Sequence, residues 1–241
     1  MHFLLAFSLL LVYYGVSMGL MSALIKATPL DNEWARKTQH IAMALSVIVY
    51  YYLFAEWHRA AIAALLLIPL AYAALYAMER TVLYHYLFVE RKMRSEYKLS
   101  MVLGQLTLVT LFILFWGILP GSSIVIVIIS ALSWGIGDAV AALVGKRYGT
   151  HTVAIPGADV KKSVEGSLSM FLIIFPLMFI LLLVLTSMVW WFALVSALLT
   201  SALGVVVEVI SKQGYDTFTL PVSMGSLLYG LMHVALWIGG M

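Results

Sequence analysis

Long apolar runs recur along the whole of this chain of 241 residues. A run of roughly 18 or more apolar residues is long enough to cross a hydrocarbon core about 30 Å thick as an α-helix. Lipid offers no hydrogen-bond partners to the backbone, so such a chain must satisfy its backbone groups within helices. We therefore expect an all-α polytopic membrane bundle, with a single membrane-embedded domain covering residues 1–241.

The composition agrees with a membrane protein. The chain is 63% hydrophobic and 10% charged, whereas a soluble domain has about 45–50% apolar and about 25% charged residues. It contains no cysteine, which excludes disulfides, thiolate metal sites and cysteine nucleophiles. The net charge of +3 is too small to favour a nucleic acid as partner, so the lipid bilayer is the expected surrounding.

Hydropathy predicts about eight transmembrane helices. The first is too long for the core of a signal peptide and has no basic stretch before it, so we expect it to be retained. The predicted spans are 3–24, 38–55, 60–78, 99–119, 122–145, 167–185, 188–210 and 221–239. Between the third and fourth spans, residues 79–98 alternate apolar patches with charge, which fits either an interfacial amphipathic helix or a solvated linker.

Lysine and arginine divide unequally between the two sets of loops. If the N-terminus is outside, 13 of the 14 basic residues fall on one face and only Arg59 falls on the other. Cytoplasmic loops carry an excess of Lys and Arg, so we expect the charged face to be cytoplasmic. An even number of spans then places both termini outside.

One carboxylate, Asp138, interrupts the fifth apolar span about seven residues before its predicted end. A carboxylate at that depth is costly unless it meets a metal ion, a cation or water. Its helical face continues with Ala141, Ala142 and Gly145. These small residues favour either close packing of a neighbouring helix or room for a polar ligand. We predict that Asp138 is a functional residue.

The segment after this span combines glycine with basic residues. Gly145-Lys146-Arg147-Tyr148-Gly149 is followed by Gly157 and then by Lys161-Lys162-Ser163. Glycine lets backbone N–H groups approach phosphate oxygens, and basic side chains neutralise them. Ser163 is the predicted N-cap of the sixth span, whose free N–H groups would form an anion site. For Lys146 and Arg147, a role as positive-inside anchors is an equal alternative.

Glu165 lies in the first turn of the predicted sixth span. An acidic residue suits the helix dipole there, yet it would repel a bound phosphate. A divalent cation between the two would remove this repulsion. Asp138 and Glu165 offer only oxygen ligands, which suit Mg²⁺ rather than Zn²⁺, so these two residues are the predicted metal ligands.

Three further polar clusters are predicted at the same membrane face, although they are far apart in the sequence. They are Arg36, Lys37 and His40 near the start of the second span, Glu208 near the end of the seventh, and Asp216, Thr217 and Thr219 just before Pro221. Pro221 is predicted to open the eighth span. We expect these clusters to share one site with Asp138.

Two stretches, GDAVAALVGKRYG at 137–149 and KKSVEGSLSMF at 161–171, resemble the CTP-dependent lipid alcohol kinases. That family comprises phytol and farnesol kinases, dolichol kinases and CTP-using diacylglycerol kinases. RKTQHI at 36–41 is similar to its Arg-Lys-x-x-His-Ile segment, and Glu208 with YDTFTLP at 215–221 is similar to its Glu…Asp-Asn-x-x-x-Pro tail. The chain departs from the family at Tyr215, Thr217 and Thr150, where Asp, Asn and Lys are frequent.

The resemblance implies a kinase that transfers the γ-phosphate of CTP to a membrane isoprenoid alcohol of the phytol, farnesol, polyprenol or dolichol type. The cofactor would be Mg²⁺, held by Asp138 and Glu165. The implied catalytic residues are Asp138, Lys162, Glu165, His40 and Asp216, and the implied nucleotide-binding residues are Arg36, Lys37, Gly137, Gly145, Lys146, Arg147, Gly149, Lys161, Ser163 and Gly166. Asp138, Asp216 or His40 could accept the proton of the alcohol.

Two other functions are weighed against the kinase. CDP-diacylglycerol synthases share a distant version of the same loop, but their Pro-Gly-His-Gly-Gly…Asp-Arg segment has no counterpart in this chain. A transporter for an anionic solute would be expected to have interrupted helices and repeated halves, and neither is visible in the sequence. The sequence leaves open which lipid alcohol is used and the oligomeric state.

Overall fold

The computed structural model describes residues 2–27, 32–78, 91–121, 123–153, 162–212 and 214–239. Their elements are α1 (Phe3–Ala27), α2 (Asn32–Phe54), α3 (Trp57–Met78), α5 (Arg91–Leu111), the π-helix η1 (Phe112–Ile118), α6 (Ile124–Tyr148), α7 (Val164–Leu185), α8 (Trp190–Ile210) and α9 (Asp216–Trp237). Within these ranges the only β pairing is an isolated bridge between Thr152 and Ser163. The predicted all-α bundle is therefore confirmed.

Seven helices of the described chain are long and apolar enough to cross a membrane, so this is a multi-pass membrane protein. The remaining described α-helix, α2, has 23 residues and is also long enough to cross the membrane. It is less apolar because its first half carries Arg36, Lys37 and His40. The sequence predicted α2 as a span beginning at residue 38, but the helix begins at Asn32, so these polar residues lie on the helix itself.

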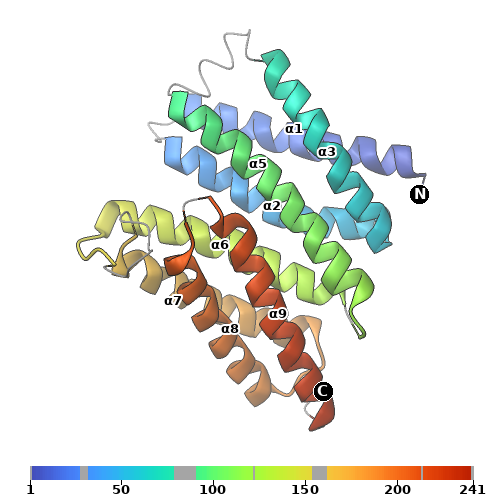
Figure 1. Cartoon of the computed structure of the whole chain (residues 1–241), viewed down its shortest axis with the longest axis vertical. Helices are drawn as coiled ribbons and strands as arrows, with labels where there is room; N and C mark the ends of the chain where they lie inside the picture. Colours follow the sequence, from blue (N-terminus) through green and yellow to red (C-terminus); the bar gives the residue numbers. More distant parts are fainter. Residues whose placement is uncertain are drawn as a thin grey trace.

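The helices form two groups that meet along α6. In Figure 1, α1, α2, α3 and α5 occupy the upper half of the molecule, and α6, α7, α8 and α9 occupy the lower half. α6 packs against α2 on one side and against α7 on the other, and α5 packs against α9. Of the apolar window of α6, 72% is buried, against 11% for α1. A polar side chain on α6 is therefore surrounded by protein.

Two further helix boundaries near the polar residues also differ from the sequence prediction. α6 continues to Tyr148, so Lys146 and Arg147 occupy its last turn, where basic residues suit the helix dipole. α9 begins at Asp216, and Pro221 lies inside it rather than at its start. Proline donates no hydrogen bond to the carbonyl four residues earlier, which belongs to Thr217. The Thr107 hydroxyl of α5 donates to that oxygen at 3.0 Å, so the helix can pass through the proline.

The linker at 79–98 is only partly described. α5 begins at Arg91, so residues 91–98 continue into the following span as helix. Residues 79–90 lie outside the described residues, so an interfacial helix or a linker there remains a prediction.

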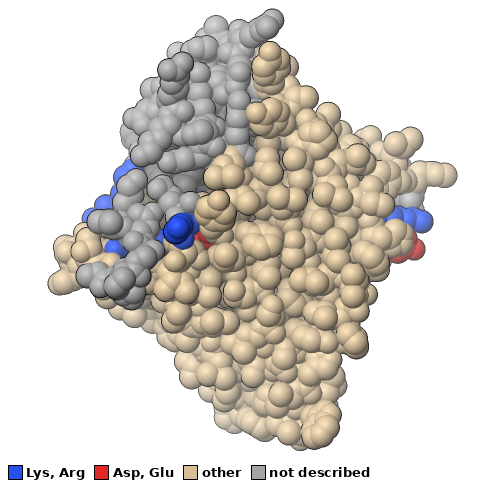
Figure 2. All heavy atoms as spheres, in the orientation of Figure 1, with Lys and Arg blue, Asp and Glu red and all other residues tan. Residues whose placement is uncertain are grey.

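The distribution of charged side chains over the molecule leads to a test of how the protein is oriented in the membrane. Figure 2 shows Lys and Arg at one edge of the molecule, a small group of basic and acidic atoms at the opposite edge, and a broad uncharged band between them. At the α2–α3 turn, Arg59 pairs with Glu56 at 2.9 Å. From the 13-to-1 distribution of basic residues we expect a reporter fused after Met241 to face the side of the membrane opposite the cytoplasm. A cytoplasmic C-terminal reporter would contradict the predicted orientation.

Candidate functional site

Asp138 is held by two basic groups from α2. The Lys37 ammonium lies 2.6 Å from Asp138 Oδ2, and His40 Nδ1 lies 3.0 Å from the same oxygen. The three side chains are at most 8% exposed. Buried charges are tolerated when they are paired and hydrogen-bonded, so the depth of Asp138 is accounted for by Lys37. The structure thus brings Lys37 and His40, two of the polar residues predicted near the start of the second span, to Asp138.

His40 has partners on both sides of its ring. While Nδ1 faces Asp138, Nε2 lies 2.7 Å from the hydroxyl of Ser100 on α5. The indole of Trp134 lies against the imidazole, with ring centroids 5.8 Å apart. If the Nδ1 proton is donated to Asp138, Nε2 is free to accept a proton from a hydroxyl. Asp138, His40 and Ser100 then form a chain that can hold a hydroxyl proton.

A second ion cluster forms where α7, α8 and α9 meet. The Lys162 ammonium lies 3.0 Å from Glu208 Oε1 and 4.0 Å from Asp216 Oδ2, and it also donates to the backbone carbonyl of Glu208. The Ser167 hydroxyl donates to Glu208 Oε2 at 3.4 Å. The backbone N–H of Thr217 donates to Asp216 Oδ1 at 2.9 Å. Glu208 and Asp216, eight residues apart in sequence, are therefore joined through Lys162.

The charges of the two clusters act on one another. Asp216 interacts with the charges of Asp138, Lys37 and Lys162, and Glu208 interacts with those of Asp138 and Asp216. Three carboxylates and two ammonium groups give these described side chains a formal charge of −1 when His40 is neutral. This negative excess attracts cations. An anionic phosphate would be repelled unless a cation accompanied it.

Glu165, the second predicted metal ligand, lies in a separate cluster. Its carboxylate accepts hydrogen bonds from the Thr150 hydroxyl at 2.6 Å and from the backbone N–H of His151 at 3.2 Å. His151 Nδ1 lies 2.7 Å from the same oxygen. The structure therefore brings Glu165 to the segment after α6. The carboxylates whose charges interact with that of Asp138 are Glu208 and Asp216.

Ser163 caps α7 as predicted from the sequence. Its side chain accepts from the N–H of Gly166 at 3.1 Å. Around it α6 and α7 cross closely: a methyl group added at Gly166 would lie 2.7 Å from the carbonyl oxygen of Ala141, and one added at Gly145 would lie 2.9 Å from Ser163 Oγ. Gly137 and Gly149 are similarly crowded by protein atoms. Close contacts with protein atoms thus account for all four glycines, and their role toward phosphate stays a prediction.

The remaining predicted nucleotide-binding residues are basic. Lys146 and Arg147 are exposed at the end of α6, and the Arg147 guanidinium lies 5.4 Å from the centre of the Tyr148 ring. Lys161, Gly157 and the side chain of Arg36 lie outside the described residues.

A magnesium ion fits the chemistry of the carboxylates Asp138, Glu208 and Asp216 but would need further ligands from elsewhere. Carboxylate oxygens are the ligands that Mg²⁺ prefers, and it is bound in nucleotide sites through one or two carboxylates plus phosphates. The described residues contain no group of three or more His, Cys, Asp or Glu side chains arranged to hold a metal. Asp138, Glu208 and Asp216 can therefore supply one or two ligands, with the phosphates completing the coordination.

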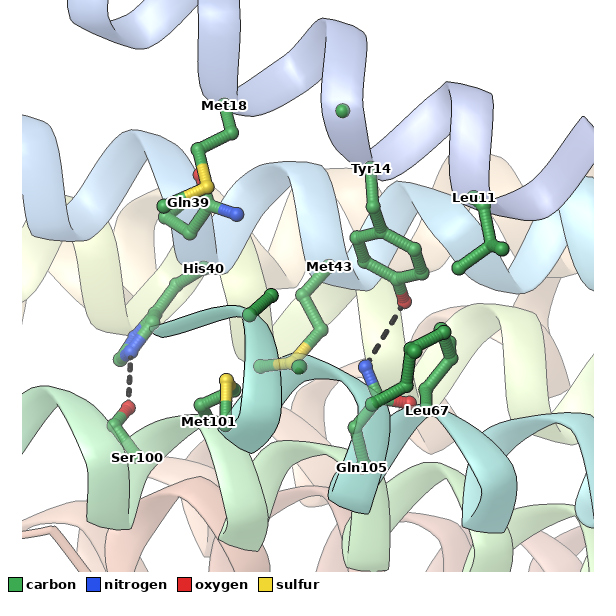
Figure 3. Close-up of a pocket in the computed structure, with 14 residues that line it drawn as sticks. Leu11, Tyr14, Met18, Gln39, His40, Met43, Leu67, Ser100, Met101 and Gln105 are labelled. Atoms are coloured by element: carbon green, nitrogen blue, oxygen red, sulfur yellow. Dashed lines mark hydrogen bonds between the residues drawn. The ribbon is translucent and has the colours of Figure 1, made fainter. Parts of the chain in front are cut away.

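A cavity of about 220 Å³ opens beside His40. It lies among α1, α2, α3 and α5, and both His40 and Ser100 line it. Figure 3 shows the His40–Ser100 contact at one end of the cavity. The charged cluster and an apolar space thus meet at a single imidazole.

Sequence reasoning missed Ser100, Gln105 and the cavity. Gln105 is a polar residue inside an otherwise apolar span, which was an available signal for a functional or packing role at that depth. Ser100 carries no such signal, because a serine near a span end is common on helix surfaces.

We compared the chain with protein-family models, with curated proteins and with solved structures, and none of the three comparisons finds a match.

Proposed function

We propose that this protein is a CTP-dependent kinase that transfers a phosphoryl group to a membrane isoprenoid alcohol. The observation that carries the proposal is the position of His40, which contacts Asp138 at 3.0 Å and also lines an apolar cavity. Phosphorylation of a lipid requires a polar, charged site for the nucleotide directly beside an apolar site for the acceptor. The motif resemblance at 137–149 and 161–171 supplies the nucleotide and the acceptor class.

The nucleotide phosphates would bind on the side of Asp138 that faces Lys162, Glu208 and Asp216. Lys162 is held by two carboxylates, so it would exchange part of this pairing for phosphate oxygens when the nucleotide binds. Phosphoryl transfer depends mainly on positioning and on neutralising charge. Lys37 and Lys162 would supply that neutralisation from two sides of the site.

Mg²⁺ bound with the nucleotide would neutralise charge on its β- and γ-phosphates. Asp138 would hold it together with Asp216 or Glu208, whose charges interact with that of Asp138. Glu165, engaged by Thr150 and His151, would instead fix the segment between α6 and α7.

Among the three proton acceptors that the sequence left open, His40 is the proposed one. Asp138 Oδ2 is engaged by Lys37 and His40, and Asp216 lies on the Lys162 side. Nε2 of His40, in contrast, already meets a hydroxyl at hydrogen-bond distance. Asp138 would hold the Nδ1 proton and so keep Nε2 oriented toward the acceptor.

The proposal is tested with purified protein in lipid nanodiscs. We expect CTP labelled in the γ-phosphate to give labelled lipid phosphate and unlabelled CDP when farnesol, phytol or a polyprenol is supplied. CTP is expected to be preferred over ATP, because the resemblance is to CTP-using kinases. Release of pyrophosphate with formation of a CDP-lipid would contradict the kinase and favour the cytidylyltransferase. Equal use of ATP would contradict only the nucleotide preference.

A further inference from the structure

The cavity beside His40 has two different ends. At one end are His40, Ser100 and Gln39; at the other, Gln105 Nε2 donates to the Tyr14 hydroxyl at 3.2 Å (Figure 3). Ser100 and Gln105 are five residues apart on α5, which corresponds to about 7.5 Å along the helix axis. The cavity is therefore a slot that runs from the charged end of the bundle into its apolar interior.

The walls between these ends are apolar. They are formed by Met18 of α1, Met43 of α2, Met101 of α5, and Leu67 and Ala71 of α3. Methionine side chains adapt their shape to flexible apolar partners. A group with several hydrogen-bond acceptors would lose its hydration in this part of the slot without gaining donors, which is costly.

The two ends of the slot differ in whether their buried polar atoms have hydrogen-bond partners. At the inner end, Tyr14 donates to Ser46 at 2.9 Å, and Tyr50 donates to Gln105 at 3.3 Å, so this network satisfies itself. At the His40 end, Gln39 Oε1 is buried without a hydrogen-bond partner among the described residues. A buried acceptor without a partner is unusual in a folded protein. It marks this end as the place for a ligand hydroxyl.

The slot also reaches the surface that would face lipid. Leu11 of α1 and Leu70 of α3 line the slot and are 37% and 43% exposed. Apolar side chains exposed in the middle of membrane-spanning helices lie against lipid chains. A lipid can therefore enter sideways, with most of its chain remaining in the bilayer.

We propose that this slot binds the hydroxyl end and the first part of the chain of a lipid alcohol with one apolar chain. The hydroxyl would lie at His40 and Ser100, and the chain would lie between the three methionines. A diacylglycerol brings two ester carbonyls that need donors along the apolar walls, whereas a single-chain alcohol brings only its hydroxyl. The inference builds on the proposed kinase by assigning its acceptor site.

In the reaction, the hydroxyl oxygen forms a bond to the γ-phosphorus of CTP. The bond between that phosphorus and the β–γ bridging oxygen breaks, and its electron pair leaves with CDP. The hydroxyl proton passes to His40 Nε2. The products are the lipid monophosphate, CDP and one proton, so atoms and charge balance.

Two glycines of α1 provide a matched pair of variants for a test. Gly15 lines the slot, Gly19 does not, and a Cβ atom added at either position meets nothing within 4 Å. Gly15→Phe should fill the slot without straining the fold, and Gly19→Phe should leave it open. Ala74 lines the slot from α3, so Ala74→Phe should also fill it and serves as a second blocking variant if Gly15→Phe is not monodisperse.

The first measurement needs no nucleotide. A farnesol analogue carrying a diazirine near its hydroxyl is photolysed with the protein in nanodiscs, and labelled peptides are identified by mass spectrometry. We expect labelling at Met18, Met43 or Met101, reduced about tenfold in Gly15→Phe, since one misplaced methylene already changes recognition that much. In Gly19→Phe it should change by less than about twofold. Equal labelling of the two variants, or labelling confined to α7 and α8, would overturn the acceptor slot.

The second measurement separates the slot from the kinase. We expect kcat/KM for farnesol to fall about tenfold in Gly15→Phe, with the KM for CTP unchanged. Labelling in the slot without any phosphate transfer would support the slot as a lipid-binding site and contradict the proposed kinase activity. Normal transfer to farnesol in a monodisperse Gly15→Phe protein would support the proposed kinase activity and contradict the slot as its acceptor site. Diacylglycerol used as well as farnesol would overturn the single-chain specificity.

Discussion

Asp138→Asn is expected to lower phosphate transfer about a thousandfold. Asparagine keeps the size of the side chain and one hydrogen-bonding oxygen but removes the negative charge. Without it, a divalent cation is held less well, and a catalytic metal contributes several kcal/mol to charge stabilisation; each 1.36 kcal/mol is about tenfold in rate. The measurement is single-turnover transfer from labelled CTP. Glu56→Gln, at the exposed α2–α3 turn with Arg59, is the control and should keep full activity.

The Lys37–Asp138 pair complicates this variant and suggests a second one. Lys37 is buried 2.6 Å from Asp138, and removing one partner of a buried pair typically costs about 3–5 kcal/mol of stability. Lys37→Met combined with Asp138→Asn removes both charges, so the double variant should be more stable than Asp138→Asn alone while remaining inactive. Thermal unfolding in detergent measures the first effect. A stable double variant with normal turnover would show that Asp138 serves only to pair Lys37.

The sequence predicted the parts of this fold that depend on local chemistry. Apolar runs gave the helices, and Ser163 followed by a long apolar stretch gave the N-cap of α7. The predicted start of α9 was wrong because a proline is common at the first position of a helix, and Pro221 lies inside α9. Here the Thr107 hydroxyl of α5 compensates at the Thr217 carbonyl. That compensation comes from 110 residues away, so no local pattern contains it.

The same distinction applies to the candidate site. The sequence marked Asp138, His40 and Glu208 as polar residues within apolar spans and Asp216 as an acidic residue just before one. The partners of these residues depend on which helices pack together. Lys37 meets Asp138 across 101 residues of sequence, and Lys162 joins Glu208 across 46 residues. Glu165 was assigned to the metal because its acidity near a phosphate needed an explanation. In the structure its carboxylate meets Thr150 and His151, on the segment that precedes it, and its role toward a metal stays a prediction.

The slot beside His40 could not be predicted from the sequence at all. A cavity is the space left when four helices fail to fill the volume between them, and that depends on side chains from all four. Gly15 and Ala71 leave room, whereas Met43 and Met101 border it. None of these residues is unusual in an apolar helix, so only their three-dimensional juxtaposition marks the site.

His40→Gln is expected to lower kcat by about a hundredfold to ten-thousandfold, the usual contribution of a positioned acid–base group. Glutamine can keep a hydrogen bond toward Asp138 or Ser100, but its amide does not accept a proton at neutral pH. Nucleotide binding should be unchanged, because His40 lies on the cavity side of Asp138. Binding of CTP is measured by calorimetry and kcat by single-turnover transfer to farnesol.

Ser100→Ala separates proton acceptance from orientation. It removes the hydroxyl 2.7 Å from His40 Nε2 but leaves Asp138 to orient the ring, so kcat should fall by no more than about tenfold, the scale of one hydrogen bond. This difference between the two variants is the decisive result. If His40 had only a structural role, His40→Gln would lower the stability of the protein rather than its kcat. If folded His40→Gln turned over as fast as wild type, His40 would not be the proton acceptor, and Asp216 would become the next candidate to substitute.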